Sequence, residues 1–397
     1  MKTFPGLAVF VGKTRKAGWL VLVITGLSLP GCGDDTSSQP ETGVSESANK
    51  APEPTPGVWR KATNEDFAES QHIYNRVIFP FWKSDFETLE QMAAEMRETD
   101  ARNRNSSWQI DAFYDAFWDY SSWNSQDPEV WSPQMETLLQ EWRKAHPDSV
   151  TPHIALAGFY VGWAWDARGG GWARDVTEEG WRLFHQRLEQ AYEVLQTGPE
   201  ALRDDPATWA VVLMISRGLG APPAQAREVF AEAQATNPGY WPNYHRMAIY
   251  LLPRWHGEHH REWHEWLTQA VAASGLPAEE QDQIYAMVTL RVIHFAYDDD
   301  DEPNPFLASR VDWERLERGS EWLLAQYPDS TRLPNYFLKA AAQRGAEEAI
   351  RRTLERMQWQ YDRWVWSGRD DSEFFELLES LRERFPDLAP LLGDPSK

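Results

Sequence analysis

Apolar residues recur at helical spacing along almost the whole of this chain, and this periodicity restricts its fold more than any other feature. Segments that alternate apolar and polar residues, as half-buried strands do, are scarce. One clear stripe has intervals of three and four residues, which places its members on a single helical face: Trp181, Phe184, Leu188, Tyr192 and Leu195. The sequence therefore predicts an all-α protein.

A common pattern of helix, proline turn and second helix occurs in three segments, at residues 142–157, 230–248 and 322–340. In each segment a proline follows the first helix: Pro147, Pro238 and Pro328. Proline ends a helix because it lacks an N–H donor and clashes with the preceding turn. Another proline follows a few residues later, and the first turn of a helix tolerates it. The pattern predicts antiparallel helix pairs joined by short turns.

Helix pairs that recur along a chain are typical of an α-solenoid. The prolines at the pair boundaries, and small residues such as Ala155 and Ala157, resemble tetratricopeptide (TPR) repeats. The interval from Pro206 to Pro238 approaches the period of that family. We therefore expect a TPR-like helical domain over residues 58–397. A non-repetitive helical domain with convergent turns is the alternative.

The beginning of the chain has the order of a secretory signal. The first 16 residues include four basic residues and no acidic ones. An uncharged, mostly apolar stretch follows, from Ala17 to Leu29. This stretch is shorter than the ~20 residues that a helix needs to span a bilayer. It ends in Leu29-Pro30-Gly31-Cys32, which resembles the lipobox of bacterial lipoproteins. An ordinary signal peptide that ends near a cysteine is the alternative.

The lipobox resemblance implies that residues 1–31 are removed and that Cys32 is acylated. Cys32 is the only cysteine of the chain, so acylation would also remove an exposed thiol that could form dimers. Residues 32–57 are rich in Ser, Thr, Pro and acidic residues and predict a disordered tether. We expect a lipid-anchored protein of the cell envelope that faces the periplasm or the exterior. Gly33 after Cys32 resembles an outer-membrane sorting signal rather than an inner-membrane one.

The charge balance limits the partners. The chain has 39 basic and 61 acidic residues and a formal net charge of −22, which disfavours nucleic acid. Its 22 tryptophans could stack on sugars, but aromatic residues at helical spacing more often form the core. We expect no cofactor and no enzymatic activity, because no catalytic constellation is visible.

Several short motifs together look like a bacterial family of helical proteins of unknown function, the DUF4034 type. They are Gly169-Gly170-Gly171-Trp172, the segment 176–181, the segment Leu252-Pro253-Arg254-Trp255-His256-Gly257, and Tyr327-Pro328-Asp329-Ser330. The resemblance covers roughly Trp131 to Leu354. It implies a helical fold and brings no activity with it.

The histidine cluster at residues 256–264 is a candidate metal site. His260 and His264 are four residues apart, so on a helix they would share a face and could both reach Zn²⁺. A metalloprotease motif needs Glu directly after the first histidine, and Arg261 stands there. A polar helix start with histidines that are solvated or stacked on tryptophan is the simpler interpretation, and we predict no metal site.

The glycine-rich loop at residues 168–174 lacks the Lys-Ser/Thr of a phosphate-binding loop, and we expect Trp172 to pack back into the core. If the protein has a binding site, we expect it on the concave face near this loop, at Trp163, Trp165, Arg168 and Trp172. The first hypothesis for function is a scaffold that binds a protein or peptide partner. The alternatives are a glycan-binding protein and, third, a metal-dependent hydrolase.

Overall fold

A computed structural model describes residues 56–62, 65–119, 128–296, 309–366 and 372–393. The proposed signal, Cys32 and nearly all of the tether lie outside these residues. The helices, in chain order, are α1 (Glu65–Trp82), α2 (Phe86–Glu98), α3 (Gln109–Trp118), α5 (Pro128–Ala145), α6 (Thr151–Arg168), α7 (Glu178–Thr197), α8 (Pro206–Leu219), α9 (Pro223–Thr236), α10 (Trp241–Tyr250), α11 (Glu262–Ala272), α12 (Ala278–Ala296), α14 (Trp313–Gln326), α15 (Arg332–Arg344), α16 (Glu347–Met357), α17 (Ser372–Arg384) and α18 (Ala389–Leu392). The described elements also include two-residue strands, β1 (Arg60–Lys61) and β2 (Gln360–Tyr361), and short 3₁₀ helices at Ala173–Asp175, Glu200–Asp204 and Pro386–Leu388.

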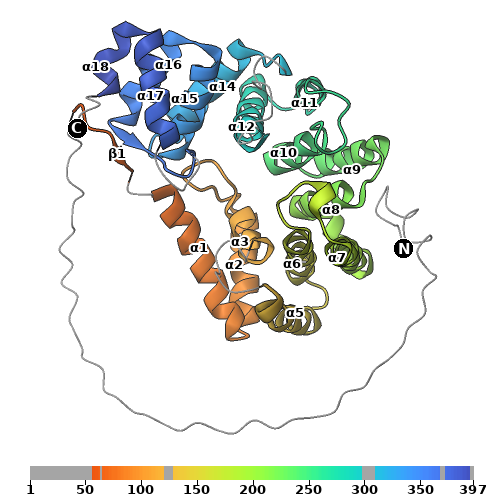
Figure 1. The fold of residues 1–397 in the computed structure, drawn as a ribbon. Helices are drawn as coiled ribbons and strands as arrows, with labels where there is room; N and C mark the ends of the chain where they lie inside the picture. Colours follow the sequence, from red (N-terminus) through yellow and green to blue (C-terminus); the bar gives the residue numbers. More distant parts are fainter. Residues whose placement is uncertain (1–55, 63–64, 120–127, 297–308, 367–371, 394–397) are drawn as a thin grey trace, which may run out of the picture.

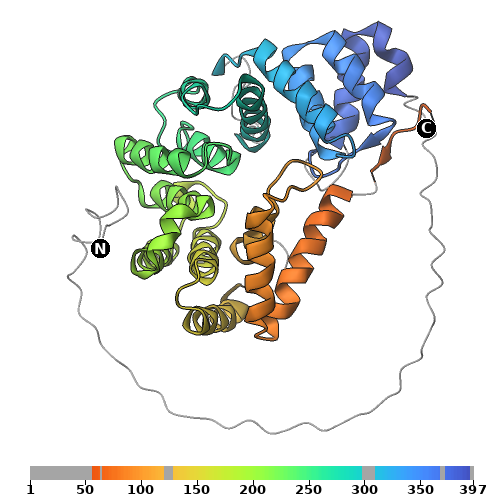
Figure 2. The same ribbon diagram turned by 180° about the vertical axis from the view of Figure 1, so that it is seen from behind.

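These elements confirm the predicted all-α fold and form an array of helices that curves into a ring (Figure 1). Along the inner side of the array, α6 packs on α8, α8 on α10, α10 on α12, and α12 on α15. The helices α7, α9 and α11 lie further from the centre, in the view from behind as well (Figure 2). The inner helices are buried over most of their surface, whereas α7 buries one face and exposes the opposite face.

The three predicted helix–turn–helix segments are present. Pro147 follows α5, Pro238 follows α9 and Pro328 follows α14, and α6, α10 and α15 begin a few residues after them. Between these turns lie further connections, where Asp205 caps α8 by accepting a hydrogen bond from Ala207 N at 2.9 Å. Each interval of about 90 residues between the proline turns therefore contains an additional pair of helices, and α8, which begins at Pro206, is one of these helices.

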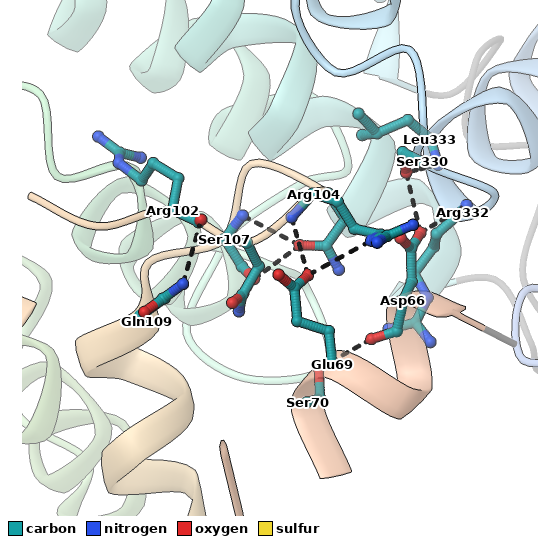
Figure 3. Close-up of polar contacts among 12 residues, drawn as sticks. Asp66, Glu69, Ser70, Arg102, Arg104, Ser107, Gln109, Ser330, Arg332 and Leu333 are labelled. Carbon is teal, nitrogen blue, oxygen red and sulfur yellow. Dashed lines mark hydrogen bonds and ion pairs between the residues drawn. The ribbon is translucent and has the colours of Figure 1, made fainter. Parts of the chain in front are cut away.

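The ring is closed by contacts between segments that lie about 300 residues apart. Strand β1 pairs in parallel with β2, with Arg60 opposite Gln360. Beside the strands, the carboxylate of Asp66 in α1 accepts hydrogen bonds from Ser330 Oγ at 2.9 Å and from Arg332 N at 2.8 Å (Figure 3). Arg332 N is one of the unpaired donors at the start of α15, so Asp66 caps that helix from the other end of the chain.

Many of the tryptophans form the core, as their helical spacing indicated. Trp142, Trp209, Trp263 and Trp366 are fully buried. Their indole N–H groups still find acceptors, for example Glu90 Oε1 for Trp142 at 2.8 Å, as buried tryptophans usually do. The expectation for Trp172 is wrong: 59% of this residue is exposed, because the loop after α6 projects from the array.

Helix α3 crosses α6 at very close range. A Cβ atom added to Gly162 would lie 1.9 Å from the backbone oxygen of Trp118, and one added to Gly158 would lie 1.5 Å from Trp118 Nε1. Only glycine lets the two backbones approach this closely. The two glycines therefore fix the position of α3, which carries one wall of the cavity described below.

Among the described residues, we find no helix with the length and apolar character needed to cross a membrane.

Candidate functional site

The structure brings together two of the four residues predicted to form a binding site. Trp165 and Arg168, near the end of α6, gather with Trp181 from α7 and with Trp255. The guanidinium carbon of Arg168 lies 5.5 Å from the ring centres of Trp165 and Trp181, and 5.7 Å from that of Trp255. Arg217 from α8 lies against the same rings, at 4.8 Å from Trp165 and 5.0 Å from Trp255. We call these five residues the Arg–Trp cluster.

The other two predicted residues lie elsewhere. Trp163 packs under Arg187, whose guanidinium carbon is 3.7 Å from its ring centre. Arg187 in turn pairs with Glu129 at 2.9 Å, so Trp163 belongs to the contact between α5, α6 and α7. Trp172 is exposed, with Arg174 beside it at 5.9 Å. These two residues lie apart from the cluster, and their role in binding stays a prediction.

The histidine cluster is not arranged on one helical face. Helix α11 begins at Glu262, so His260 precedes it and only His264 is helical. His264 turns into the core, 8% exposed, with its Nε2 2.6 Å from the hydroxyl of Tyr285. His256 instead stacks on Tyr250 and places its Nε2 2.8 Å from the backbone oxygen of Arg217. Among the described residues, no three His, Cys, Asp or Glu side chains are grouped so that they could hold a metal ion.

The buried His264 makes stability depend on pH. Burial lowers the pKa of His264 to about 4, whereas an unfolded histidine titrates near 6.5. The fold therefore favours the neutral ring: this contribution is complete above pH ~6.5 and is lost as the pH falls from there toward 4. Between pH 7 and pH 4.5, we expect the natural chain to lose about 2 kcal/mol more of its free energy of unfolding than a His264→Gln variant. Urea unfolding at each pH measures this difference, and parallel pH profiles for the two proteins would contradict it.

A further candidate site lies at the centre of the ring, and the sequence did not point to it. A cavity of about 470 Å³ opens between α1, α3, α10, α12 and α15. This volume is in the range of sites that hold small molecules or short peptide segments. One wall is acidic and one is basic, and aromatic rings such as Trp241 and Tyr336 lie between them.

The acidic wall is one face of α3. Asp111, Asp115 and Asp119 follow one another at intervals of four residues and all line the cavity. Burial raises the pKa of Asp115, and the neighbouring carboxylate of Asp111 raises it further. Burial also raises the pKa of Asp111, although Tyr240 donates a hydrogen bond to its carboxylate at 2.7 Å, which acts to lower that pKa. Burial and the proximity of the two carboxyl groups therefore favour the protonated form of Asp115.

The basic wall comes from α12 and α15. Arg291 lies over the ring of Trp241 at 4.5 Å, and Arg332 pairs with Asp362 at 3.3 Å. The charges of Arg246 and Arg291 oppose the rise in the pKa of Asp111 and Asp115. Within the described part of the chain, however, neither arginine comes within ion-pair distance of those carboxylates. Arg246 and Arg291 therefore act on the carboxyl groups of Asp111 and Asp115 from a distance and not through an ion pair.

Hydrogen bonds between α1 and the loop before α3, and within that loop, hold part of the rim of the cavity (Figure 3). Arg104 N donates to Glu69 Oε2 at 2.8 Å, which ties the loop before α3 to α1. In the same loop, Ser107 lines the cavity and donates to the side-chain oxygen of Asn105 at 2.7 Å. The cavity is thus bounded by segments that the fold fixes in position.

The spacing of Asp111, Asp115 and Asp119 was a signal that sequence reasoning could have used, because carboxylates four residues apart share a helical face. The arginines gave no such signal, since each comes from a different helix.

Residues 81–235 match the model of one protein family. Its description is "Domain of unknown function (DUF4034)". The match runs from the end of α1 to the end of α9 and so contains the acidic wall and most of the Arg–Trp cluster. The resemblance expected over Trp131–Leu354 is therefore wrong in its extent, because the segments 252–257 and 327–330 lie outside the DUF4034 match. No curated protein and no solved structure matches the chain.

Proposed function

We propose that this protein binds, without catalysing a reaction, a segment of a partner protein in the central cavity of its helical ring. The observation that carries the proposal is a cavity lined by the carboxyl groups of Asp111 and Asp115 on one side and by Arg291 and Arg332 on the other. A polypeptide segment offers both charges together with apolar groups for Trp241 and Tyr336. Helical arrays commonly present such concave surfaces to peptides and proteins.

We propose further that the protein is exported and anchored by acyl chains on Cys32, with residues 32–57 as the tether. The ends of the described domain support a single attachment point, because Gly393 packs against the backbone of Gly57. Each buried methylene of an acyl chain contributes about 0.8 kcal/mol to membrane binding. The ring would then be held at the cell envelope, in the outer membrane rather than the inner, with its partner in the same compartment.

A photo-crosslinking amino acid tests the binding site directly. It replaces Tyr336, which lines the cavity, or Glu189, which is exposed on α7, in the full-length chain in membranes of the producing cell. We expect one reproducible protein adduct from position 336 and none from position 189. No adduct at 336, or the same adduct at both positions, would contradict the proposal. The same membranes test the anchor, since a Cys32→Ser chain should lose its acyl mass and leave the membrane fraction.

A glycan remains a second candidate because one rim residue of the cavity, Trp364, is 46% exposed. Exposed tryptophan rings can stack on sugars. Quenching of tryptophan fluorescence by oligosaccharides, abolished in a Trp364→Ala variant, would favour this candidate over a protein partner.

A further inference from the structure

Five successive inner helices each contribute one arginine to a single row. These are Arg168 of α6, Arg217 of α8, Arg246 of α10, Arg291 of α12 and Arg332 of α15. Neighbours in the row are close enough to act on one another. Burial, together with the charges of Arg246 and Arg168, lowers the pKa of Arg217, and burial, together with the charge of Arg332, lowers the pKa of Arg291. We call these residues the inner arginine row.

The row is unusual in a chain with a formal net charge of −22. The outer helices carry exposed acidic residues, among them Glu179, Glu189, Glu228, Glu314 and Glu348. Inside the ring, Arg246 and Arg291 face the acidic wall of α3, and Arg332 pairs with Asp362. The other end of the row, at Arg168 and Arg217, has no carboxylate within ion-pair distance among the described residues. Positive charge is therefore concentrated, without a counter-ion, at the Arg–Trp cluster.

Hydrogen-bond donors at the cluster also lack protein acceptors. Arg217 Nε, Trp165 Nε1 and Trp255 Nε1 are all buried and have no partner within hydrogen-bond distance in the described residues. The two indole rings lie 5.3 Å apart, and Arg217 lies against both of them. Buried donors are rarely left unpaired in folded proteins. Three such donors in one place are available to an acceptor from outside the chain.

The cluster also has the rigidity that a binding site requires. Arg168 Nη1 donates to the backbone oxygens of Gly169 and Gly171, at 2.9 and 3.1 Å, which fixes the guanidinium above the loop. Trp255 is held at the other side, because Gly257 approaches the backbone of Leu251 so closely that an added Cβ would lie 1.9 Å from its oxygen. A planar guanidinium that is held between aromatic rings is suited to a carboxylate, which can accept two parallel N–H bonds.

We propose that Arg168 and Arg217, enclosed by Trp165, Trp181 and Trp255, form a carboxylate-binding site that takes an acidic side chain of the partner segment. This inference rests on the proposed function and specifies its ligand: an extended acidic peptide whose further carboxylates lie along the inner arginine row toward Arg246. The row continues into the central cavity, so one peptide would occupy both sites.

The test is the binding of fluorescein-labelled hexaglutamate to the full-length chain in detergent, followed by fluorescence anisotropy. Hexaglutamine is the uncharged comparison, and monomeric glutamate is the competitor. We expect hexaglutamate to bind and hexaglutamine to bind at least about tenfold more weakly. Arg217→Gln should weaken hexaglutamate binding by about tenfold, and Arg217→Lys should restore part of the loss. The matched control is Arg182→Gln on the outer face of α7, where Arg182 pairs with Glu179 at 2.5 Å, and it should bind as the natural chain does.

Thermal unfolding separates a binding role from a structural one. Removing a guanidinium that has two like charges nearby and no counter-ion should leave the melting temperature of Arg217→Gln unchanged or higher. A lower melting temperature with unchanged hexaglutamate binding would overturn the inference, as would equal binding of hexaglutamate and hexaglutamine. If monomeric glutamate competes as well as hexaglutamate at the same concentration of glutamate residues, the ligand is not an extended peptide. If hexaglutamate does not bind while the crosslinker at position 336 still yields a protein adduct, the partner is a protein but not an acidic one, and the carboxylate site is overturned. If hexaglutamate binds and no adduct forms, the carboxylate site is supported and the proposed function is contradicted.

Discussion

Replacing Arg97 with alanine should lower the free energy of unfolding by about 3–5 kcal/mol, the cost of leaving a buried charge without its partner. Arg97 in α2 donates through Nε to Asp205 at 2.7 Å and through Nη1 to Thr151 Oγ1 at 3.1 Å, and its Nη2 donates to Tyr114 OH. Asp205, only 6% exposed, caps α8, and Thr151 begins α6. One side chain thus joins four helices, and its removal strands the Asp205 carboxylate.

Urea unfolding followed by circular dichroism measures this loss. The control is Arg182→Ala, which breaks an ion pair whose two side chains are 57% and 63% exposed. Pairs that are this exposed contribute about 0–1 kcal/mol, so the control should be nearly neutral. A double variant, Arg97→Ala with Asp205→Asn, should lose less than the sum of the single changes, because the asparagine carries no charge and still caps α8. A loss of less than about 1 kcal/mol for Arg97→Ala would show that Asp205 finds another partner.

The second large effect is expected at the crossing of α3 and α6. Gly162→Ala places a methyl group 1.9 Å from the backbone oxygen of Trp118, and neither backbone can move without displacing its helix. We expect a loss of about 3 kcal/mol, at the upper end of what overpacking costs. Because α3 carries Asp111 and Asp115, the variant should also weaken the binding of any ligand of the central cavity.

Gly170→Ala is the matched control for this glycine. It lies in the loop after α6, and an added Cβ there would meet nothing within 4 Å. The change should alter the free energy of unfolding by no more than about 0.5 kcal/mol, as is usual for surface positions. Equal melting temperatures for Gly162→Ala and Gly170→Ala would mean that α3 can shift away from α6 at little cost.

The local features of the fold could be predicted from the sequence, because they depend on neighbouring residues. Pro147, Pro238 and Pro328 end helices where proline chemistry requires it, and the stripe from Trp181 to Leu195 faces the core. The shared helical face considered for His260 and His264 is wrong, because helix α11 begins only at Glu262. The chain instead makes irregular turns up to Arg261, and His264 points inward to Tyr285.

The features that assemble the site could not be predicted, because they depend on the curvature of the whole array. Asp66 meets Arg332 only when the ring closes. Arg217 and Arg246 become neighbours because α8 packs on α10, and no spacing in the sequence announces that contact. Trp165 and Arg168 were found because they lie beside an unusual loop, whereas Trp255 was noted only as part of the segment 252–257.

The pairing of β1 with β2 has a consequence for the evolution of such chains. Open helical arrays lengthen or shorten by duplicating or losing a repeat, since each repeat contacts only its neighbours. Here strands β1 and β2 must pair, with Arg60 opposite Gln360, so the ring can close with only one number of helices between them. An inserted pair of helices would separate β1 from β2 and expose the edges of both strands. Chains built on this plan should therefore vary in their loops and conserve their helix count.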